Sequence, residues 1–162
     1  MSKLKASSKP LWQCPVCGET FTTANQWHSC GKFSLKELFS RSEPHVFKIY
    51  RRFARMVRAC GPVTIIPQKT RVTFQVRMRF VSLYPRKSHL LGGFIFDRRH
   101  DHPKFYKVES LSPRNHLHHF RLESEEDLDS DFAGWIAEAY AVGEQRHITQ
   151  RENRNNDEVS TP

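Results

Sequence analysis

Three cysteines and a histidine lie close together near the start of the chain, in the stretch CPVCGETFTTANQWHSC. Cys14 and Cys17 form a Cys-x-x-Cys pair, and a ten-residue spacer separates them from the pair His28 and Cys30. Two thiolates at this spacing can converge on one cation, and the glycine after Cys17 allows a tight turn. Because four nitrogen and sulfur ligands fill the tetrahedral shell of Zn²⁺, the sequence predicts a closed, structural zinc site formed by these four residues.

Two features leave alternatives to this zinc site open. The His-x-Cys pair is tighter than the roughly three to five residues that usually separate two histidine ligands, and Cys60 could be recruited in place of one ligand. Free thiols in an unstructured arm are one alternative. A thioredoxin-like redox pair is disfavoured, because no strand-helix unit surrounds Cys14 and Cys17.

The chain that carries this cluster has the composition of a globular protein. It has 162 residues, of which 38% are hydrophobic, enough for one domain with a small appendage. It holds no run of about 18 apolar residues, and the opening MSKLKASSKPLW lacks the apolar region of a secretory signal. We therefore expect a cytoplasmic protein with no membrane partner, in a reducing compartment where clustered cysteines bind metal more often than they form disulfides.

Two helices are predicted beside a sheet. Residues 34–60 follow a helical pattern that restarts at Pro44, with apolar side chains on one side and basic side chains on the other. Gly61 and the proline after it end this helix. Residues 128–140 repeat apolar side chains at helical spacing, and acidic residues precede them, which is typical of a helix N-terminus.

Strands are predicted between the two helices. The stretch RVTFQVRMRF, residues 71–80, alternates apolar and polar side chains and indicates one half-buried strand with Arg71, Arg77 and Arg79 on its outward face. Short, turn-rich connections favour an antiparallel meander over parallel crossovers. Further strands are predicted at residues 63–66, 89–97, 105–111 and 116–122.

The predicted fold class is therefore α+β. An antiparallel β-meander sheet packs with an N-terminal basic helix and a C-terminal helix, and a small zinc-knuckle-like segment precedes them. The expected organisation is a zinc-binding leader at residues 10–32, an α+β domain at 33–143 and a disordered tail at 144–162.

Three stretches also carry a resemblance to a known family: LWQCPVCGETFTTANQWHSCGKFSLKELF, GPVTIIPQKTRVTFQVRMRFVSLYPRKSHLLGGFIFD and HHFRLESEEDLDSDFAGWIAEAY. They resemble an uncharacterised bacterial family of small domains of unknown function, whose members often carry this Trp-x-Cys-Pro-x-Cys-Gly and His-Ser-Cys leader. The resemblance covers most of residues 11–143, and the leader and the YPRKSHL segment are its most specific parts. It implies an α+β fold with a zinc-type leader and no established activity.

The positive charge is concentrated in one part of the chain. The net charge is +9, and residues 34–99 hold 15 basic and 3 acidic residues, whereas residues 100–143 hold 4 basic and 9 acidic ones. Basic surfaces attract polyanions, and the planar arginine fork suits phosphate. We therefore predict a noncatalytic binding module for nucleic acid or a related polyanion, which contacts backbone phosphates. The predicted contact residues, with Tyr84, Arg86 and Lys87 placed in a loop, are Arg51, Arg52, Arg55, Arg58, Arg71, Arg77, Arg79, Tyr84, Arg86 and Lys87.

Two other functions stay open. Histidines at positions 100, 102, 116, 118 and 119 could serve an enzyme that acts on a phosphorylated or nucleotide substrate, together with the Tyr84 loop. No paired carboxylates, nucleophile elbow or phosphate-binding glycine loop accompany them, so the sequence disfavours catalysis. The third hypothesis is an adaptor whose basic face binds an acidic protein. A solvated basic face without any ligand is the simplest reading of such charge.

Overall fold

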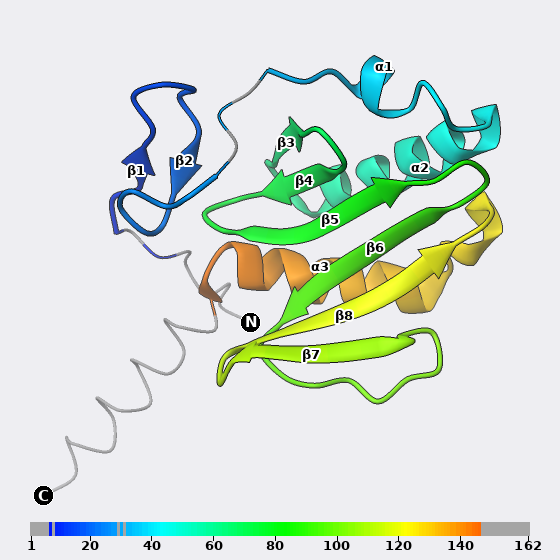
Figure 1. The fold of residues 1–162 in the computed structure, drawn as a ribbon. Coiled ribbons are helices and arrows are strands. Elements are labelled where there is room, and N and C mark those ends of the chain that lie inside the picture. The colour runs from blue at the N-terminus through cyan, green and yellow to red at the C-terminus, as the bar shows by residue number, and fades with distance from the viewer. Residues whose placement is uncertain (1–6, 8, 29, 31, 147–162) are drawn as a thin grey trace, which may run out of the picture.

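The structure is a computed structural model and describes residues 7, 9–28, 30 and 32–146. The centre of the fold is a six-stranded antiparallel sheet. The strands are β3 (Thr64–Pro67), β4 (Val72–Gln75), β5 (Arg79–Pro85), β6 (Leu90–Phe96), β7 (Lys107–Ser112) and β8 (Asn115–Leu122). They lie side by side in the order β3-β4-β5-β6-β8-β7 (Figure 1). With the helices that pack against it, this sheet confirms the predicted α+β fold class.

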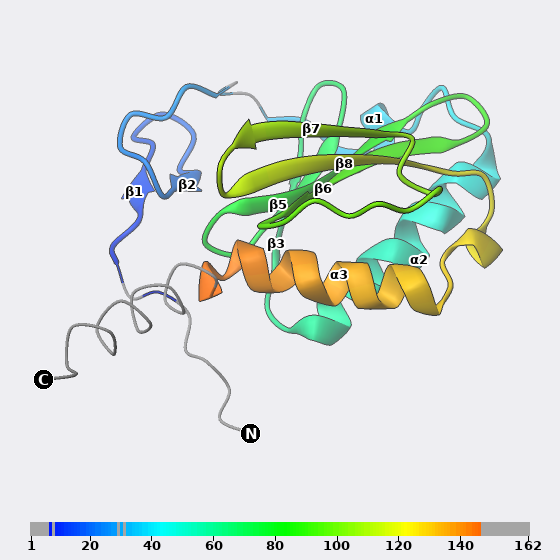
Figure 2. The same cartoon turned by 90° about the horizontal axis from the view of Figure 1, so that it is seen from below.

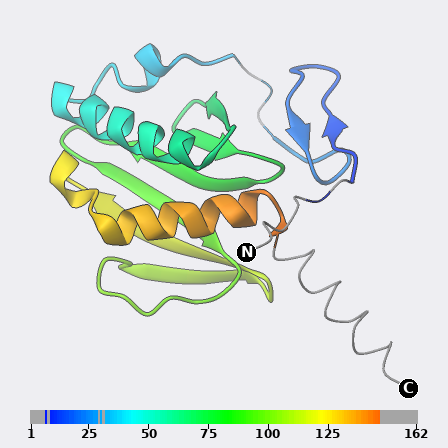
Figure 3. The ribbon, with the colours of Figure 1, turned by 180° about the vertical axis from the view of Figure 1, so that it is seen from behind.

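Two long helices cover the same face of the sheet. The helical elements are α1 (Leu35–Leu38), α2 (Pro44–Cys60), the short 3-10 helix η1 (Glu125–Asp127) and α3 (Ser130–Gly143). Figures 2 and 3 show α2 and α3 together on one side of the sheet. Helix α2 begins at Pro44 as predicted, because proline has no N–H to leave unpaired at a first helical position.

The core lies between these helices and the sheet. The rings of Phe53 from α2, Phe94 from β6 and Phe120 from β8 stack with centroids 4.6–6.1 Å apart. Gly92 provides room for this cluster, since a Cβ atom there would lie 2.3 Å from the Phe120 ring. Alternation along the strands therefore directs one set of side chains into the core and the other set to the opposite face.

That opposite face, termed the helix-free face, is covered by none of the described helices (Figure 3). Across its centre, Thr73, Ser82, Gly93 and His119 lie in register on four adjacent strands. Most of these residues are polar or small. The helix-free face is therefore the face of the sheet that the described helices leave uncovered.

The single strand predicted at residues 71–80 is wrong, because the chain turns back at Val76–Met78 between β4 and β5. The backbone N–H groups of Arg77 and Met78 both donate to the carbonyl oxygen of Gly143, at 2.9 and 3.0 Å. The turn is thus stabilised by the end of α3, in addition to a local hydrogen bond from the N–H of Val76 to the carbonyl of Met78 at 3.3 Å. As a result, Arg77 lies in a turn and not on a strand face.

The meander also changes after β6. Strand β8 pairs with β6, and β7 lies outside it at the edge of the sheet. The connection between β6 and β7 is fixed in this path by Phe105, which is buried in the core, and by the N–H of Tyr106, which donates to the carbonyl of His119. A long-range packing contact therefore decides the order of the last two strands.

The two edge strands differ from the inner ones. Strand β3 ends at Pro67, and β7 has an irregular register between Ser110 and Ser112.

None of the helices in the described ranges combines the length and apolar character needed to span a membrane. The tail predicted at 144–162 falls mostly on residues 147–162, which lie outside the described residues.

Candidate metal centre and adjoining cleft

The four predicted ligands come together in space. Side-chain ligand atoms of Cys14, Cys17, His28 and Cys30 all lie within 4.8 Å of one another. The Sγ atoms of Cys14 and Cys30 are 3.7 Å apart, and His28 Nε2 lies 3.2 and 3.1 Å from the Sγ atoms of Cys17 and Cys30. A tetrahedron with Zn–S bonds of about 2.3 Å has edges of about 3.8 Å. The cluster therefore fits one tetrahedral ion.

A short hairpin, β1 (Trp12–Gln13) and β2 (Thr20–Phe21), positions the first ligand pair. The N–H of Cys14 donates to the carbonyl of Glu19 at 2.8 Å, and the N–H of Gly18 donates back to the carbonyl of Cys14 at 2.9 Å. Gly18 has φ of +77°, a conformation that glycine adopts without strain. The glycine after Cys17 thus makes the turn that brings both thiols to one side.

Hydrogen bonds prepare two of the ligands for a cation. His28 Nδ1 donates to the carbonyl oxygen of Gln26 at 2.7 Å, which leaves Nε2 with its lone pair toward the thiols and raises the pKa of the ring. A hydrogen bond from the backbone N–H of Cys17 lowers the pKa of the Cys14 thiol to about 6. Burial and the neighbouring thiols Cys14 and Cys17 raise the pKa of the Cys30 thiol to about 11. Since the thiolate is the form that binds metal, Cys14 is the thiol that is ready to bind a cation, and Cys30 must lose its proton as the cation binds.

Cys60 takes no part in this cluster. It lies at the end of α2, and its Sγ is within 3.7 Å of the carbonyl oxygen of Met56. Among the described residues, the cluster of potential ligands holds the four predicted side chains and no others.

The described residues of the leader pack against the hairpin end of β4 and β5. Gln75 Nε2 donates to the carbonyl of Thr20 at 2.5 Å, and the Arg79 guanidinium pairs with Glu19 at 2.6 Å. The same guanidinium lies 4.8 Å from the centre of the Phe21 ring, which in turn is 4.4 Å from the His28 ring. A continuous set of contacts thus joins the cluster of potential metal ligands to the sheet.

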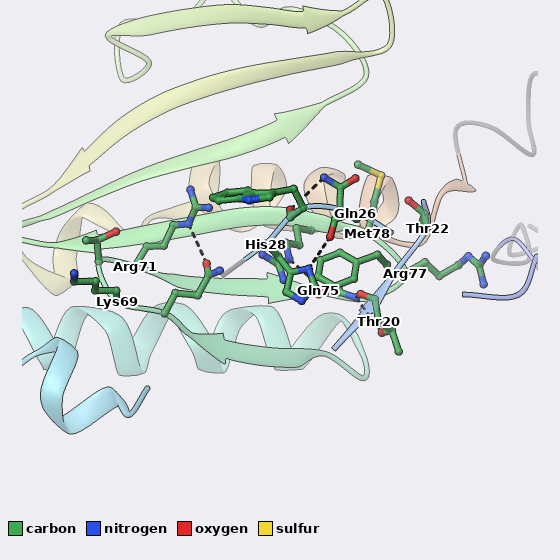
Figure 4. Close-up of a pocket in the computed structure, with 14 residues that line it drawn as sticks. Thr20, Thr22, Gln26, His28, Lys69, Arg71, Gln75, Arg77 and Met78 are labelled. Atoms are coloured by element: carbon green, nitrogen blue, oxygen red, sulfur yellow. Dashed lines mark hydrogen bonds between the residues drawn. The ribbon is translucent and has the colours of Figure 1, made fainter. Parts of the chain in front are cut away.

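A cavity of about 440 Å³ lies between the leader and the sheet. Figure 4 draws leader residues such as Gln26 and His28 beside sheet residues such as Arg71 and Gln75. This leader–sheet cleft is lined by Thr20, Phe21, Thr22, Gln26, Trp27, His28, Gln68, Lys69, Thr70, Arg71, Gln75, Arg77, Met78 and Arg79. Its lining contains four basic side chains and no acidic one.

The basic side chains of the cleft differ in their partners. Arg71 donates to Gln68 Oε1 at 2.9 Å and to the Tyr84 hydroxyl at 2.8 Å, and both acceptors are neutral. Arg77 donates to Gln145 Oε1 and to a backbone carbonyl, which are neutral as well. Among the described residues, Arg79 is the one basic side chain of the cleft with an acidic partner, Glu19. The cleft therefore keeps a net positive charge.

Two further hollows adjoin the cleft. The first, the turn hollow, has a volume of about 680 Å³, shares Lys69 and Thr70 with the cleft and extends to Arg86 and Lys87. The second, the sheet hollow, has a volume of about 270 Å³, shares Arg71 and Arg79 with the cleft and lies over Gly93 on the helix-free face. The leader–sheet cleft thus has Lys69 where it meets the turn hollow, and Arg71 and Arg79 where it meets the sheet hollow.

The predicted polyanion contacts divide into two groups. One group lies along the cleft and its hollows: Arg71, Arg77, Arg79, Tyr84, Arg86 and Lys87. The other group lies on α2, which packs on the opposite face of the sheet: Arg51, Arg52, Arg55 and Arg58. Tyr84 belongs to strand β5 rather than to a loop, and only Arg86 and Lys87 occupy the turn. The two groups therefore do not form one continuous surface.

The histidines have structural partners. His118 is fully buried, its Nδ1 donates to the carbonyl of His116, and its Nε2 accepts the N–H of His100 at 2.8 Å. His119, the next residue along β8, points to the other face, where it contacts Glu109 at 2.6 Å. Because its two ring nitrogens are occupied and it is inaccessible, His118 is a poor acid or base for a bound substrate.

Most of the cleft lining was not predicted from the sequence, including Gln68, Lys69 and Trp27, and of these three only Trp27 left a signal. Gln68 and Lys69 lie in a short connection that looks like an ordinary turn. Trp27 precedes a metal ligand directly and is 86% exposed, which is unusual for tryptophan. An aromatic residue in the polar spacer between two ligand pairs could have drawn attention to it.

Comparison with known proteins identifies the main domain. Residues 35–143 match the model of a domain of unknown function, DUF5655, and this span runs from α1 to α3. No curated protein and no solved structure matches the chain. The matched span is more than half of the 162 residues, and the metal cluster lies outside it. The chain therefore belongs to the DUF5655 family of domains of unknown function.

Proposed function

We propose that this protein is a noncatalytic binding module for nucleic acid or a related polyanion, which it binds in the leader–sheet cleft. The observation that carries the proposal is the charge of that cleft: Lys69, Arg71 and Arg77 line it, and no acidic side chain does. Arg71 and Arg77 now donate hydrogen bonds to neutral acceptors. Phosphate oxygens of a bound ligand would accept from these guanidinium groups in place of the neutral acceptors or beside them. Arginine forks bind phosphate in two-pronged geometry, which lysine cannot do.

Zinc is the metal that we propose for the leader. Three thiols and one imidazole are the ligands of structural zinc sites, and four protein ligands leave no open position for a reacting water. Cys14, Cys17, His28 and Cys30 would hold the ion, which would fix the leader against β4 and β5. Because thiolate ligands need a reducing compartment, we also place the protein in the cytoplasm.

The binding proposal is tested with two double variants that remove equal charge. Lys69→Ala with Arg71→Ala alters the cleft, whereas Arg51→Ala with Arg55→Ala alters the exposed side of α2. We expect the cleft variant to bind labelled DNA and RNA at least about tenfold more weakly than the α2 variant at equal salt, as measured by fluorescence anisotropy. Affinity of the parent should fall steeply between about 50 and 200 mM salt.

Equal weakening by both pairs would contradict the cleft as the binding site. Absence of nucleic-acid binding even at low salt would reject the proposal as a whole. In that case, selective binding of acidic peptides would favour the adaptor hypothesis instead.

Metal content tests the zinc proposal directly. We expect one zinc per chain in purified parent protein and in Cys60→Ser, and a loss of most of it in Cys14→Ser. Cys60→Ser is the matched control, because Cys60 lies outside the cluster. A parent protein without zinc would contradict the proposal.

A further inference from the structure

We infer that the nucleic acid bound in the leader–sheet cleft is single-stranded, with two unpaired bases held on either side of Arg71. This inference rests on the proposed function and names the form of its ligand. Three features of the described residues carry it: an exposed aromatic ring, an arginine that lines both the cleft and the sheet hollow, and the apolar lining of that hollow.

The exposed ring is that of Trp27. It lies in the lining of the leader–sheet cleft and is 86% exposed, although tryptophan is usually buried. The neighbouring His28 is tied to the metal cluster, so the backbone that carries Trp27 is anchored. An anchored and uncovered indole is a platform on which any unpaired base can stack.

The shared arginine is Arg71, which lines both the leader–sheet cleft and the sheet hollow. Gln68 and Tyr84 hold its guanidinium through two hydrogen bonds. A guanidinium has five N–H donors, so three are left for a ligand. A phosphate bound to Arg71 would lie between the leader–sheet cleft and the sheet hollow. If one base enters each of these two spaces, the nucleic-acid backbone that joins the bases must pass this point.

The third feature is the sheet hollow itself. The Leu117 side chain leans over Gly93, since a Cβ atom on Gly93 would lie 2.7 Å from Leu117 Cδ1. Leu117 and Ile95 thus give the hollow an apolar floor, and Ser82 and His119 also line it. An apolar floor with hydroxyl and imidazole groups at the rim suits a flat heterocycle, whose faces are apolar and whose edges form hydrogen bonds.

Duplex nucleic acid cannot use these features. In a duplex the base faces are covered by neighbouring pairs, and only the edges are accessible in the grooves. Stacking on Trp27 and insertion into the sheet hollow both need a free base face. Unpairing a duplex to supply these faces costs free energy.

The test is a series of thymidine and uridine oligonucleotides of one, two, four and eight residues, compared with an eight-base-pair duplex. Competition against a labelled single strand measures the affinities of the parent protein. We expect a large gain from one to two residues, because the second base and the bridging phosphate bind together. We also expect the single strand to bind at least about fivefold more tightly than the duplex. Comparison of thymidine with uridine strands shows whether DNA or RNA is preferred.

Two variants test the assignments to residues. Trp27→Ala should weaken single-strand binding at least about fivefold, and Trp27→Phe should restore most of it. Because the Trp27 side chain is exposed, neither change should alter the melting temperature. Arg71→Ala should remove the gain between one and two residues, whereas Arg55→Ala on α2 should leave it.

The outcomes separate the two proposals. If no nucleic acid binds, the proposed function fails and this inference fails with it. If the protein binds the duplex as tightly as the single strand, or if Trp27→Ala binds as the parent does, only this inference is overturned, and the phosphate-binding cleft stands.

Discussion

Burial holds the pKa of the His118 side chain at about 4, well below its ordinary value of 6.5. The cause is first the loss of water around the ring. The N–H of His100 also points at Nε2, where an added proton would have to sit. In the unfolded chain the ring titrates near 6.5. Between these two values the unfolded state binds a proton that the folded state does not.

The free energy of unfolding should therefore fall as the pH drops from about 6.5 to about 4, by up to about 3 kcal/mol from this residue. Above pH 7 the residue should cause no change. Urea unfolding at several pH values measures this dependence. His118→Leu should be less stable at neutral pH but should lose the part of the acid sensitivity that His118 causes. An equal pH dependence in parent and variant would contradict the assignment.

For single residues, the clustering of the four side chains Cys14, Cys17, His28 and Cys30 could be predicted, but the residues of the sheet that the leader contacts could not. The spacing of Cys14, Cys17, His28 and Cys30 is local, so ligand chemistry alone identifies them. The partners of the leader on the sheet, by contrast, are 55 and 60 residues away along the chain. Nothing in the residues around Glu19 indicates that Arg79 will pair with it.

At the scale of the elements, two glycines differ in the space around them: Gly92 in strand β6 and Gly134 in helix α3. In β6, a Cβ atom on Gly92 would lie 2.3 Å from the Phe120 ring and 3.0 Å from Leu83 Cδ2. In α3, a Cβ atom on Gly134 would meet nothing within 4 Å. The same chemical change should therefore have opposite effects in the two elements.

We expect Gly92→Ala to destabilise the fold by about 1–3 kcal/mol through overpacking. Gly134→Ala, the matched control, should stabilise it by about 0.5–1 kcal/mol, because alanine is the better helix former. Chemical denaturation of both variants measures the two changes. A Gly92→Ala protein as stable as the parent would show that the Phe120 ring can move aside.

Element prediction failed where the chain relied on distant contacts. The helices and most strands follow from local periodicity, which is why their positions are confirmed. The turn at Val76–Met78 carries no glycine, proline or asparagine, and alternation continues through it. Its N–H groups bond to Gly143, near the other end of the domain. No local pattern could have revealed it.

For the whole molecule, the leader and the main domain should respond differently to the loss of metal. In the described leader only Cys14 and Phe21 are buried hydrophobic residues, so the leader has almost no core of its own. The main domain has a large aromatic core between its sheet and helices. Metal binding energy is therefore expected to be the folding energy of the leader alone.

Treatment with a chelator should accelerate hydrogen exchange at residues 12–28 and leave exchange in β6 and α3 unchanged. Nucleic-acid affinity should fall at least about tenfold, because the leader forms one wall of the cleft. Hydrogen exchange followed by mass spectrometry, with anisotropy on the same sample, measures both effects. Re-addition of zinc should reverse them, and cooperative unfolding of the entire chain would contradict this division.

The two outermost strands have a consequence for concentrated solutions of the protein. An edge strand exposes unpaired N–H and C=O groups and can recruit strands from other molecules, which leads to fibrils. Here β3 is short and ends in a proline, and β7 is interrupted by its irregular register and begins with Lys107. Each of these features hinders the addition of a further strand. The sheet is thus protected at both edges against aggregation by strand addition.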